Sequence, residues 1–499
     1  MKRILCLFIA LLMVLGTVVA CQTSPDDEET TDTAADSTKE VGGDTSAADN
    51  TDDSDYTLSM TEAELKQWDG ETFTIRTSDT TVATTWIDFE ELSSDPVENA
   101  MYLRSLYLED VMGIEFVDVV APDYYSGSYT LVDTLVTGGD DTYDLFYVRC
   151  IESISLWSDG DIYTFDELQY VDLEKSYWAQ DINPGLTLAG EQYTAVGSAD
   201  LNVYDFTFAL VFSKELFEQN SSLPDLYELV RNGEWTVDKM QEILASSYFD
   251  ANGDGNRDSS DRYGYLADNR MVVPSFIVSC GTTMVSKDSD DYPVLNLTDD
   301  YFFSVFTKVF EIMWDDENWY SDYTGDGQDV PSSNIEMFEN NQAYFLDCSF
   351  NYVVQLRKME SEFGIVPYPK WDEDQEEYYA RVSYFWSFVV PNTADPDFAG
   401  AVMEVLNYYS ATDGGVVTAY YDQSLSGRTM RDEESQEMLD IIFSHRVADL
   451  GDTTFCDSVR DGLIAGMFAG NTRTISTFQS NEKALNKKFA KYIENALGS

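Results

Sequence analysis

The sequence predicts an α/β fold, and three observations point to it. Strand-like runs alternate along the chain with segments whose apolar residues have helical spacing. Hydrophobic residues make up 43% of the chain and aromatic residues 14%, which is ample for a large core. With 499 residues, the chain is long enough for two or three domains, or for one protein with two lobes. We therefore expect an α/β architecture with largely parallel sheets.

The first half of the folded region alternates between the two kinds of element. A first strand is predicted by GETFTIRTS, and a helix followed by a strand start is predicted by DPVENAMYLRSLYLEDVMGIEF. Further strands are expected in TYDLFYVRC and EQYTAVGS, and a strand joined to a helix in ALVFSKELFEQ. In GEWTVDKMQEIL, we expect Thr236 to cap a helix with apolar positions Val237, Met240, Ile243 and Leu244.

The second half continues the pattern. Strands are predicted by NNQAYFLDCSF, FGIVPYP and YFWSFVVPN, and the last of these leads into the helix PDFAGAVMEVLNYYSA. The C-terminal part, from SQEMLDIIFSHRVADLG to ALNKKFAKYIENALGS, is expected to be largely helical. The sequence contains no internal repeat.

The N-terminus has the pattern of an export signal. Lys2 and Arg3 precede an apolar run that is too short for a comfortable membrane span, and no second stretch approaches that length. The run ends in VVAC at Cys21, which resembles the lipobox of bacterial lipoproteins. This resemblance implies that residues 1–20 are a signal peptide and that Cys21 is lipidated, with palmitate as a typical chain. An ordinary secretory signal with an incidental Cys21 is the alternative.

An acidic segment follows the signal. Residues 22–55 contain 12 acidic residues and one lysine, with few branched apolar residues, so we expect a disordered tether over residues 21–56. The remaining chain from Tyr56 has 80 acidic and 26 basic residues, which excludes nucleic acid as a partner. We expect a monomer held by lipid on the extracellular face of a Gram-positive cell membrane.

Cysteine and histidine offer little for catalysis. Cys150, Cys280, Cys348 and Cys456 are widely spaced without a CxxC pair, so two disulfides and four buried thiols remain alternatives. The sole histidine, His445, lies in an apolar helix and has no histidine partner for a zinc site. The GxSxG, HExxH, Walker and GxGxxG motifs are absent, so no enzyme activity is expected.

A loop with calcium-site spacing stands out in DANGDGNRDSSD. Oxygen ligands would come from side chains at positions one, three, five, nine and twelve and from a backbone carbonyl at position seven, with Gly255 at the sharp turn. The six ligand positions are Asp250, Asn252, Asp254, Asn256, Asp258 and Asp261. We expect a structural Ca²⁺; a turn without metal is the alternative.

Several segments, taken in order, resemble the extracellular solute-binding proteins of ABC importers, the carbohydrate-type family 1. They include KSYWAQDINPGLTLAGEQYTAVGSADLNVYDFTFALVFSKELFEQ, NGEWTVDKMQEIL, FVVPNTADPDFAGAVMEVLNYYS and RDEESQEMLDIIFSHRVADLG. The resemblance implies a two-lobed periplasmic-binding-protein fold of type II, with a ligand cleft between the lobes and a permease as partner. It places lobe one at 57–198 and 372–425, and lobe two at 199–371 and 426–499.

Candidate ligand contacts are residues that follow strand ends or lie near the implied crossovers. Aromatic faces bind sugar rings, and carboxylates and amides bind hydroxyl groups. The candidates are Trp86, Asp88, Arg149, Trp157, Tyr204, Asp205, Phe350, Asn351, Tyr384, Trp386, Tyr420 and Tyr421. For Arg149, a structural ion pair is favoured over binding an anionic sugar.

The expected function is capture of a solute, most readily a saccharide, in a closing cleft. Two other functions remain open. A surface lipoprotein that holds polysaccharide on an open platform would not need a permease, and a glycan-active enzyme would need two distinguishable carboxylates.

Overall fold

The computed structural model describes residues 57–78, 87–89, 91–121, 127–245, 247–321, 332–383, 385–421 and 433–498. The chain divides after Asp55, and every described element lies in the part that begins at Tyr56. The predictions for Cys21, Trp86, Tyr384 and the acidic tether therefore lie outside the described residues.

A four-stranded sheet organises lobe one. Its strand order is β12-β3-β1-β2, in which β1 pairs in parallel with β2 and β3, and β12 pairs antiparallel with β3. The strands span Thr72–Ser78 (β1), Glu115–Ala121 (β2), Leu145–Arg149 (β3) and Trp386–Val389 (β12).

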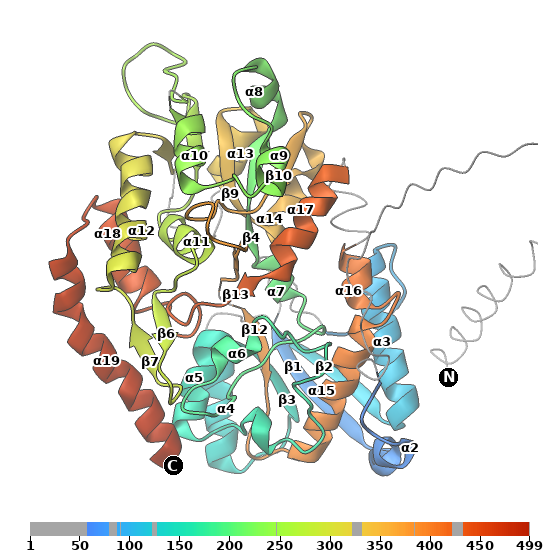
Figure 1. Ribbon diagram of the computed structural model, residues 1–499. Helices are drawn as coiled ribbons and strands as arrows, with labels where there is room; N and C mark the ends of the chain where they lie inside the picture. The colour runs from blue at the N-terminus through green and yellow to red at the C-terminus, as the bar shows by residue number, and fades with distance from the viewer. Residues whose placement is uncertain are drawn as a thin grey trace, which may run out of the picture. The chain divides into compact units, whose positions relative to one another are not determined.

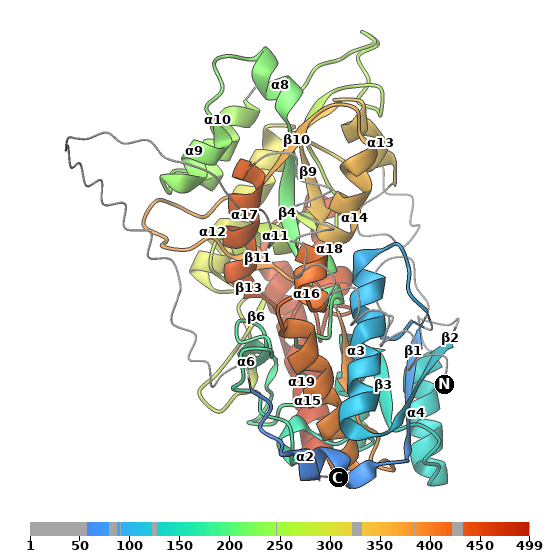
Figure 2. The same ribbon diagram turned by 90° about the vertical axis from the view of Figure 1, so that its right-hand side faces the viewer.

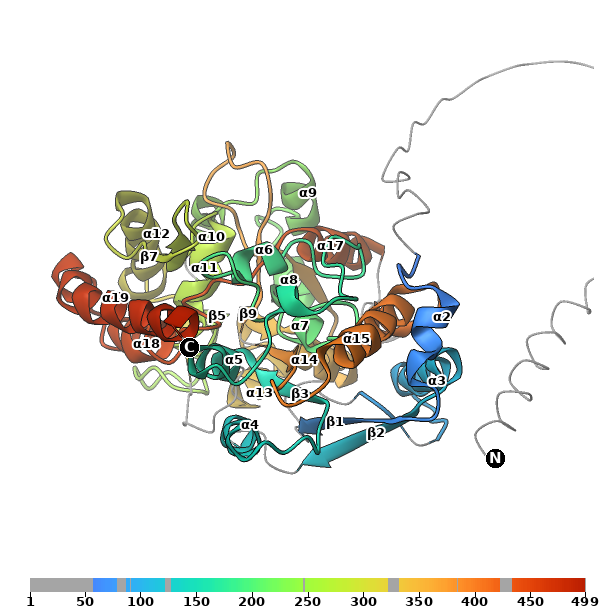
Figure 3. The same cartoon turned by 90° about the horizontal axis from the view of Figure 1, so that it is seen from below.

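Helices cover both faces of this sheet (Figure 3). Phe73 and Ile75 of β1 pack on one face with residues of α3 and α15, which run alongside each other (Figure 2). Phe146 and Val148 of β3 pack on the other face with α4 and α5. The helical elements are α2 (Glu62–Leu65), η1 (Lys66–Trp68), α3 (Pro96–Met112), α4 (Gly127–Gly138), α5 (Cys150–Asp159), η2 (Phe165–Glu167), α6 (Asn183–Leu186), α7 (Asn202–Asp205), α15 (Pro396–Ala411) and α16 (Val416–Thr418).

A five-stranded sheet organises lobe two. Its order is β10-β4-β9-β5-β8, with β5 parallel to β8 and β9, and β4 antiparallel to β9 and β10. The expectation of largely parallel sheets holds for lobe one, where two of the three strand pairs are parallel, but not for lobe two, where two of the four are. The cause is the crossovers: β4 and β12 enter their sheets from the edge at which β9 and β3 end, so they run against these neighbours.

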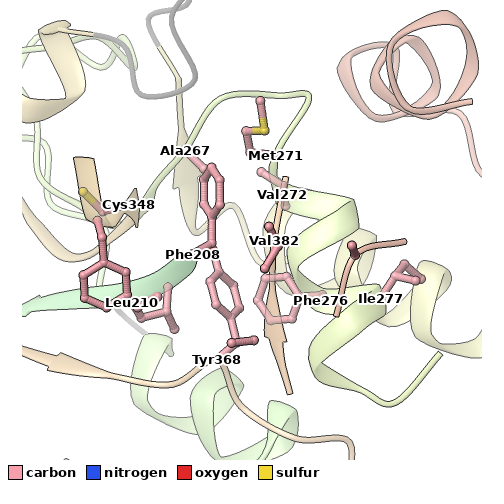
Figure 4. Close-up of a cluster of buried hydrophobic side chains, with 14 of the residues drawn as sticks. Phe208, Leu210, Ala267, Met271, Val272, Phe276, Ile277, Cys348, Tyr368 and Val382 are labelled. Carbon is pink, nitrogen blue, oxygen red and sulfur yellow. The ribbon is translucent and has the colours of Figure 1, made fainter. Parts of the chain in front are cut away.

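The core of lobe two lies between its sheet and α11. Phe208, Val272, Phe276 and Tyr368 contribute side chains to it (Figure 4). The elements of this lobe are β4 (Phe208–Ser213), α8 (Lys214–Gln219), α9 (Leu226–Arg231), α10 (Val237–Leu244), β5 (Tyr263–Leu266), α11 (Val272–Ser279), β6 (Val285–Lys287), β7 (Pro293–Leu295), α12 (Asp300–Phe310), η3 (Glu311–Asp315), β8 (Trp319–Tyr320), α13 (Ser332–Glu339), β9 (Ala343–Ser349), α14 (Phe350–Val353), η4 (Val354–Lys358), β10 (Phe363–Val366) and β11 (Ala380–Arg381).

The lobes are joined where three chain passages run together. Thr207 forms an antiparallel bridge with Val382, and the N–H of Ser383 donates to the carbonyl of Phe206 at 3.0 Å. The N–H of Val382 donates to the carbonyl of Val447 at 2.9 Å. These bonds fix the crossover between the two sheets, near α7 and β13 in Figure 1.

The C-terminal elements contact both lobes. They are α17 (Glu433–Ser444), β13 (Arg446–Val447), η6 (Arg460–Ile464), α18 (Ala465–Ala469) and α19 (Ile475–Gly498). α17 packs on β10 of lobe two, whereas α19 packs along α5 of lobe one and also contacts β7 (Figure 1). Of the described helices, none combines the length and the apolar character that crossing a membrane would need.

Most local predictions hold, with two exceptions, one of which is that the helix expected to contain His445 ends at Ser444, before β13. Thr236 caps α10 through Lys239, whose N–H donates to the Thr236 hydroxyl at 3.2 Å, as expected. The strand expected in EQYTAVGS does not form, although Tyr193 and Val196 are fully buried. The N–H of Val196 donates instead to the Asn183 side chain at 2.9 Å, so this segment bonds to the start of α6 and not to a sheet.

Candidate ligand-binding site

The two sheets face each other with the edges at which their parallel strands end. In lobe one, β1 and β3 end at Ser78 and Arg149, and β12 begins at the same edge because Trp386 pairs with Arg149. In lobe two, β9 ends at Ser349 opposite Phe208, the first residue of β4. Since the crossover joins these edges, they lie opposite each other, and ligands of open α/β sheets bind at such carboxyl edges. We call this region the interlobe site.

Arg149 holds a structural ion pair on the lobe-one side. Its Nε lies 3.3 Å from a carboxylate oxygen of Glu152 in the first turn of α5. Glu152, only 6% exposed, also accepts the N–H of Tyr129 at 3.4 Å. Arg149 therefore has the ion pair that the sequence favoured, and a direct ligand contact stays a prediction.

Arg76 is a second arginine of this edge. It is 9% exposed and lies near the end of β1. Its Nη1 donates to the hydroxyl of Ser128, in the first turn of α4, at 3.1 Å. The sequence pattern did not single out Arg76, because one charged residue inside an alternating strand is common on a solvent-facing side.

Asp88 is one of the acidic residues that interact electrostatically with the buried Arg104 of α3. Burial lowers the pKa of Arg104 to about 10, and the charge of Asp88 is the strongest of those that oppose this shift. Arg104 donates to the carbonyl of Ile87 at 2.6 Å. Burial also raises the pKa of Asp118 to about 6. Asp88 therefore helps to neutralise Arg104, and its contact with a ligand stays a prediction.

An aromatic cluster brings together five of the predicted residues at the crossover. Its centre is Phe443 of α17, whose ring lies 5.4 Å from Tyr204, 4.7 Å from Phe350 and 6.2 Å from Tyr421. Tyr420 packs 5.8 Å from Tyr204 and donates its hydroxyl to Asp205 at 2.8 Å. Burial and the Asp205 carboxylate raise the pKa of Tyr420 well above its usual range. The interlobe aromatic cluster is therefore Tyr204, Asp205, Phe350, Tyr420, Tyr421 and Phe443.

A pocket of about 280 Å³ adjoins this cluster and is lined by lobe one and by the C-terminal elements. Trp178 and Asp181 line it from lobe one, and Phe443 and Arg446 line it from the C-terminal elements. Arg446 binds Asp181 through two nitrogens, at 2.8 and 3.0 Å, and lies over the ring of Tyr204 at 4.8 Å. The pocket thus offers aromatic faces beside a charged pair.

Three other predicted contacts lie at or near the strand ends. Trp157 is 5% exposed and stacks on Tyr193 at 5.2 Å, and Trp386 is 1% exposed and stacks on Phe206 at 5.8 Å. Asn351 is partly buried in α14. Both tryptophans are core residues of lobe one, and a ligand contact of all three stays a prediction.

Sequence reasoning missed Phe443, Arg446, Glu152 and Arg76. The sequence predicted one apolar helix through His445, but Phe443 lies in the last turn of α17 and Arg446 lies in β13. Only the tertiary contacts with Tyr204 reveal them. The position of Glu152 could have been predicted from the sequence, because an acidic residue three positions after a strand end fits the first turn of a helix.

A buried ion network supports the crossover. Asp452 accepts from Arg381 at 2.5 Å and from Arg460 at 2.9 Å, and the three side chains are at most 2% exposed. Burial alone would raise the pKa of Asp452, but the two guanidinium groups hold it below its usual range. Arg460 also donates to Ser383 of the crossover at 3.3 Å. Asp461 is the second acid of the network, 2.7 Å from Arg460 Nε, so two aspartates balance the charges of the two arginines.

The loop at 250–261 forms a turn that its own side chains stabilise through hydrogen bonds. Asp250 accepts the N–H of Gly253 at 2.7 Å and of Gly255 at 3.0 Å. Asp261 is fully buried and accepts the hydroxyl of Tyr248 at 3.0 Å. Among the described residues, only Cys456, Asp457 and Asp461 place three thiol or carboxylate ligand atoms within 4.8 Å of one another, so the carboxylates of the loop are not gathered that closely.

The remaining reactive side chains are structural. Cys150, Cys280, Cys348 and Cys456 are free and buried, and burial raises the pKa of each thiol. His445 lies at the surface, 3.5 Å from Glu377.

Comparison with known proteins identifies the fold. No family model matches the sequence, and no curated protein matches it. Among solved structures, the sugar-binding protein MalE from Xanthomonas citri aligns at a TM-score of 0.57 and 14% identity, covering 84% of this chain and 98% of that one. The chain has the two-lobed fold of ABC substrate-binding proteins.

Two further substrate-binding structures support this assignment. The substrate-binding protein Lmo0181 from Listeria monocytogenes, in complex with cycloalternan, gives a TM-score of 0.55 at 13% identity and covers 85% of this chain and 100% of that one. The GacH receptor of Streptomyces glaucescens gives 0.53 at 12% identity, covering 84% and 98%. The prediction of a two-lobed α/β fold is confirmed.

Proposed function

We propose that this protein is the substrate-binding component of an ABC importer and captures a saccharide between its lobes. The observation that carries the proposal is the interlobe site, in which both carboxyl edges of a substrate-binding fold meet at an aromatic cluster and paired charges. Closure of two lobes around a hinge would turn ligand binding into a change of shape that a permease can recognise.

The class of ligand follows from the chemistry of the pocket and from similar proteins. Aromatic faces such as those of Tyr204 and Phe443 suit the C–H surfaces of sugar rings, and the pair of Arg446 and Asp181 can bond hydroxyl groups. The compared structures include Lmo0181 in complex with cycloalternan, GacH in complex with acarbose, and the sugar-binding protein MalE.

We also propose that lipid on Cys21 holds the protein at the extracellular face of the membrane. The lipobox and the acidic tether support this proposal. A tether raises the effective concentration of the binding protein near its permease. Loss of membrane association in a Cys21→Ser variant, measured by fractionation, would support it, and unchanged association would contradict it.

A calcium ion in the 250–261 loop is a further proposal. Its support is the ligand spacing together with the turn held by Asp250 and the buried carboxylate of Asp261. The ion would stiffen this part of lobe two and would not enter the interlobe site.

The two rival functions make different predictions. All three compared structures are described as binding proteins or receptors, which favours binding over turnover. An open polysaccharide platform would keep its shape when it binds, and a glycan-active enzyme would release products.

A combined screen tests the proposal. Melting temperatures with mono-, oligo- and acidic saccharides, and with peptides as controls, identify the class of ligand. Small-angle scattering with the best ligand then measures shape. We expect saccharides to raise the melting temperature and the radius of gyration to fall. Stabilisation by peptides alone contradicts the saccharide proposal, unchanged scattering favours the platform, and product release favours the enzyme.

A further inference from the structure

Arg76, near the end of β1, is buried, and none of the residues that the structure describes supplies it with a counter-charge. In the part of the chain that the structure describes, its one hydrogen-bond partner is the Ser128 hydroxyl, 3.1 Å from Nη1, and no carboxylate lies within ion-pair distance. The Nε and Nη2 atoms of Arg76 have no hydrogen-bond partner among the described residues, and neither atom is fully buried. The side chain is 9% exposed, so it is fixed in place while two of its donor atoms stay accessible.

Scarcity of acidic residues does not explain this arrangement. From Tyr56 onward the chain has 80 acidic residues against 26 basic ones. The more deeply buried arginines among the described residues each have an aspartate nearby: Asp88 for Arg104, Asp452 for Arg381 and Arg460, and Asp181 for Arg446. A buried cation without a partner is costly, so its retention points to a partner that arrives from outside.

The surroundings of Arg76 are positive. Ser128 lies in the first turn of α4, a helix of 12 residues, and a helix N-terminus carries partial positive charge. Arg149 ends the neighbouring strand β3 and is paired with Glu152. These contacts therefore include two arginines, Arg76 and Arg149, and the N-terminus of α4, but only one acidic side chain, Glu152. In so acidic a protein, the local excess of positive charge favours an anion.

We propose that Arg76 binds a carboxylate of the ligand, and that the ligand is an acidic saccharide containing uronic acid. The guanidinium fork offers parallel N–H groups that match the two oxygens of a carboxylate, and Nε and Nη2 are the donors left for it. The site lies at the carboxyl edge of β1, where a ligand held between the lobes would meet it. This inference rests on the proposed function and names the chemistry of its ligand.

Matched probes and variants test this proposal. Oligomers of galacturonate, glucuronate and mannuronate are titrated by calorimetry into the wild-type protein, each beside its neutral methyl ester. The variants are Arg76→Gln, Arg76→Lys and, as a surface control, Arg231→Gln. We expect at least one acid to bind at least about 10-fold more tightly than its ester, and Arg76→Gln to weaken that acid by about 10- to 100-fold. Arg76→Lys keeps the charge without the fork and should lie between the two.

The outcomes separate this inference from the proposed function. Equal affinity of acid and ester, or an Arg76→Gln variant that binds the acid as the wild type does, overturns the inference and leaves saccharide binding intact. If neither acids nor neutral saccharides bind, the proposed function fails and the inference fails with it. Melting curves of the variants without ligand show that any loss of binding is not a loss of folding.

Discussion

Buried arginines lie at the crossover and in β1 of lobe one, and the two places differ in their counter-charges. At the crossover, Asp452 lies between Arg381 and Arg460, and each guanidinium also donates to a serine. In lobe one, Arg76 has only the Ser128 hydroxyl among the described residues. The matched site stabilises the crossover, while the unmatched site keeps hydrogen-bond donors for a ligand.

The difference teaches how burial should be interpreted. A buried ion network with all groups bonded is weak evidence for function, since it serves packing and the choice of one conformation. A buried cation with free donors at a strand end has no such role. Breaking each site should therefore have opposite consequences for the free energy of unfolding.

Removing the charge of Asp452 should have the largest effect. Asp452→Asn leaves the buried guanidinium of Arg381 without a counter-charge and Arg460 with Asp461 alone, so we expect the free energy of unfolding to fall by about 3–5 kcal/mol. Chemical denaturation followed by circular dichroism measures it. The exposed Asp457→Asn is the matched control and should change stability by less than about 0.5 kcal/mol. A loss for Asp452→Asn as small as that of the control would show that the network is dispensable.

The 250–261 loop extends the comparison to a site rich in negative charge. If Ca²⁺ binds there, calcium at 100 times its dissociation constant should stabilise the protein by about 2.7 kcal/mol relative to the chelated form. Thermal melts with chelator, Ca²⁺ and Mg²⁺ test this. Asp250→Ala should abolish the calcium effect, and the exposed Asp290→Asn should keep it. Identical melting temperatures with chelator and with calcium would exclude the metal.

Glu404 offers a buried acid to compare with the buried arginines. It accepts the Tyr177 hydroxyl and, at 3.0 Å, the Trp178 indole N–H, and burial still raises its pKa to about 7 from 4.5. The folded state therefore holds this proton more tightly than the unfolded state. The contribution to stability is full below pH 4.5 and is lost as the pH rises through about 7.

The measurement is the pH dependence of unfolding. Between pH 5 and 8, the wild type should lose about 1–3 kcal/mol more stability than Glu404→Gln, in which this proton cannot be lost. Glu494→Gln on the exposed side of α19 controls for the change in net charge. Parallel pH profiles for the wild type and Glu404→Gln would mean that Glu404 stays ionised throughout.

Local signals in the sequence predicted most of the fold. The apolar spacing around Thr236 and the start of α15 after Asp395 were sufficient, because caps and helical periodicity depend on neighbours along the chain. The antiparallel course of β4 and β12 could not be predicted in the same way. It depends on where the crossover enters each sheet, which is a property of the tertiary fold.

The candidate site was less accessible to prediction for a related reason. Proximity to a strand end placed Tyr204 and Phe350 in the interlobe aromatic cluster, but it could not show that Trp157 and Trp386 pack into the core. Side-chain direction at a strand end depends on packing against distant segments. Arg76 stands out because no carboxylate of the described residues pairs with it, and the absence of a contact leaves no local pattern in a sequence.

Arg76→Met should have the smallest effect on stability and the opposite sign to Asp452→Asn. It replaces a cation that lacks an ion pair by an apolar side chain of similar length, at the expense of one hydrogen bond to Ser128. We expect the free energy of unfolding to rise by up to about 1 kcal/mol, a gain typical of relieving strain at a functional site. Denaturation without ligand measures it, beside Ser128→Ala, which removes the same hydrogen bond and keeps the charge. A loss of stability in Arg76→Met greater than in Ser128→Ala would mean that Arg76 serves the fold, and the contrast with Asp452 would then disappear.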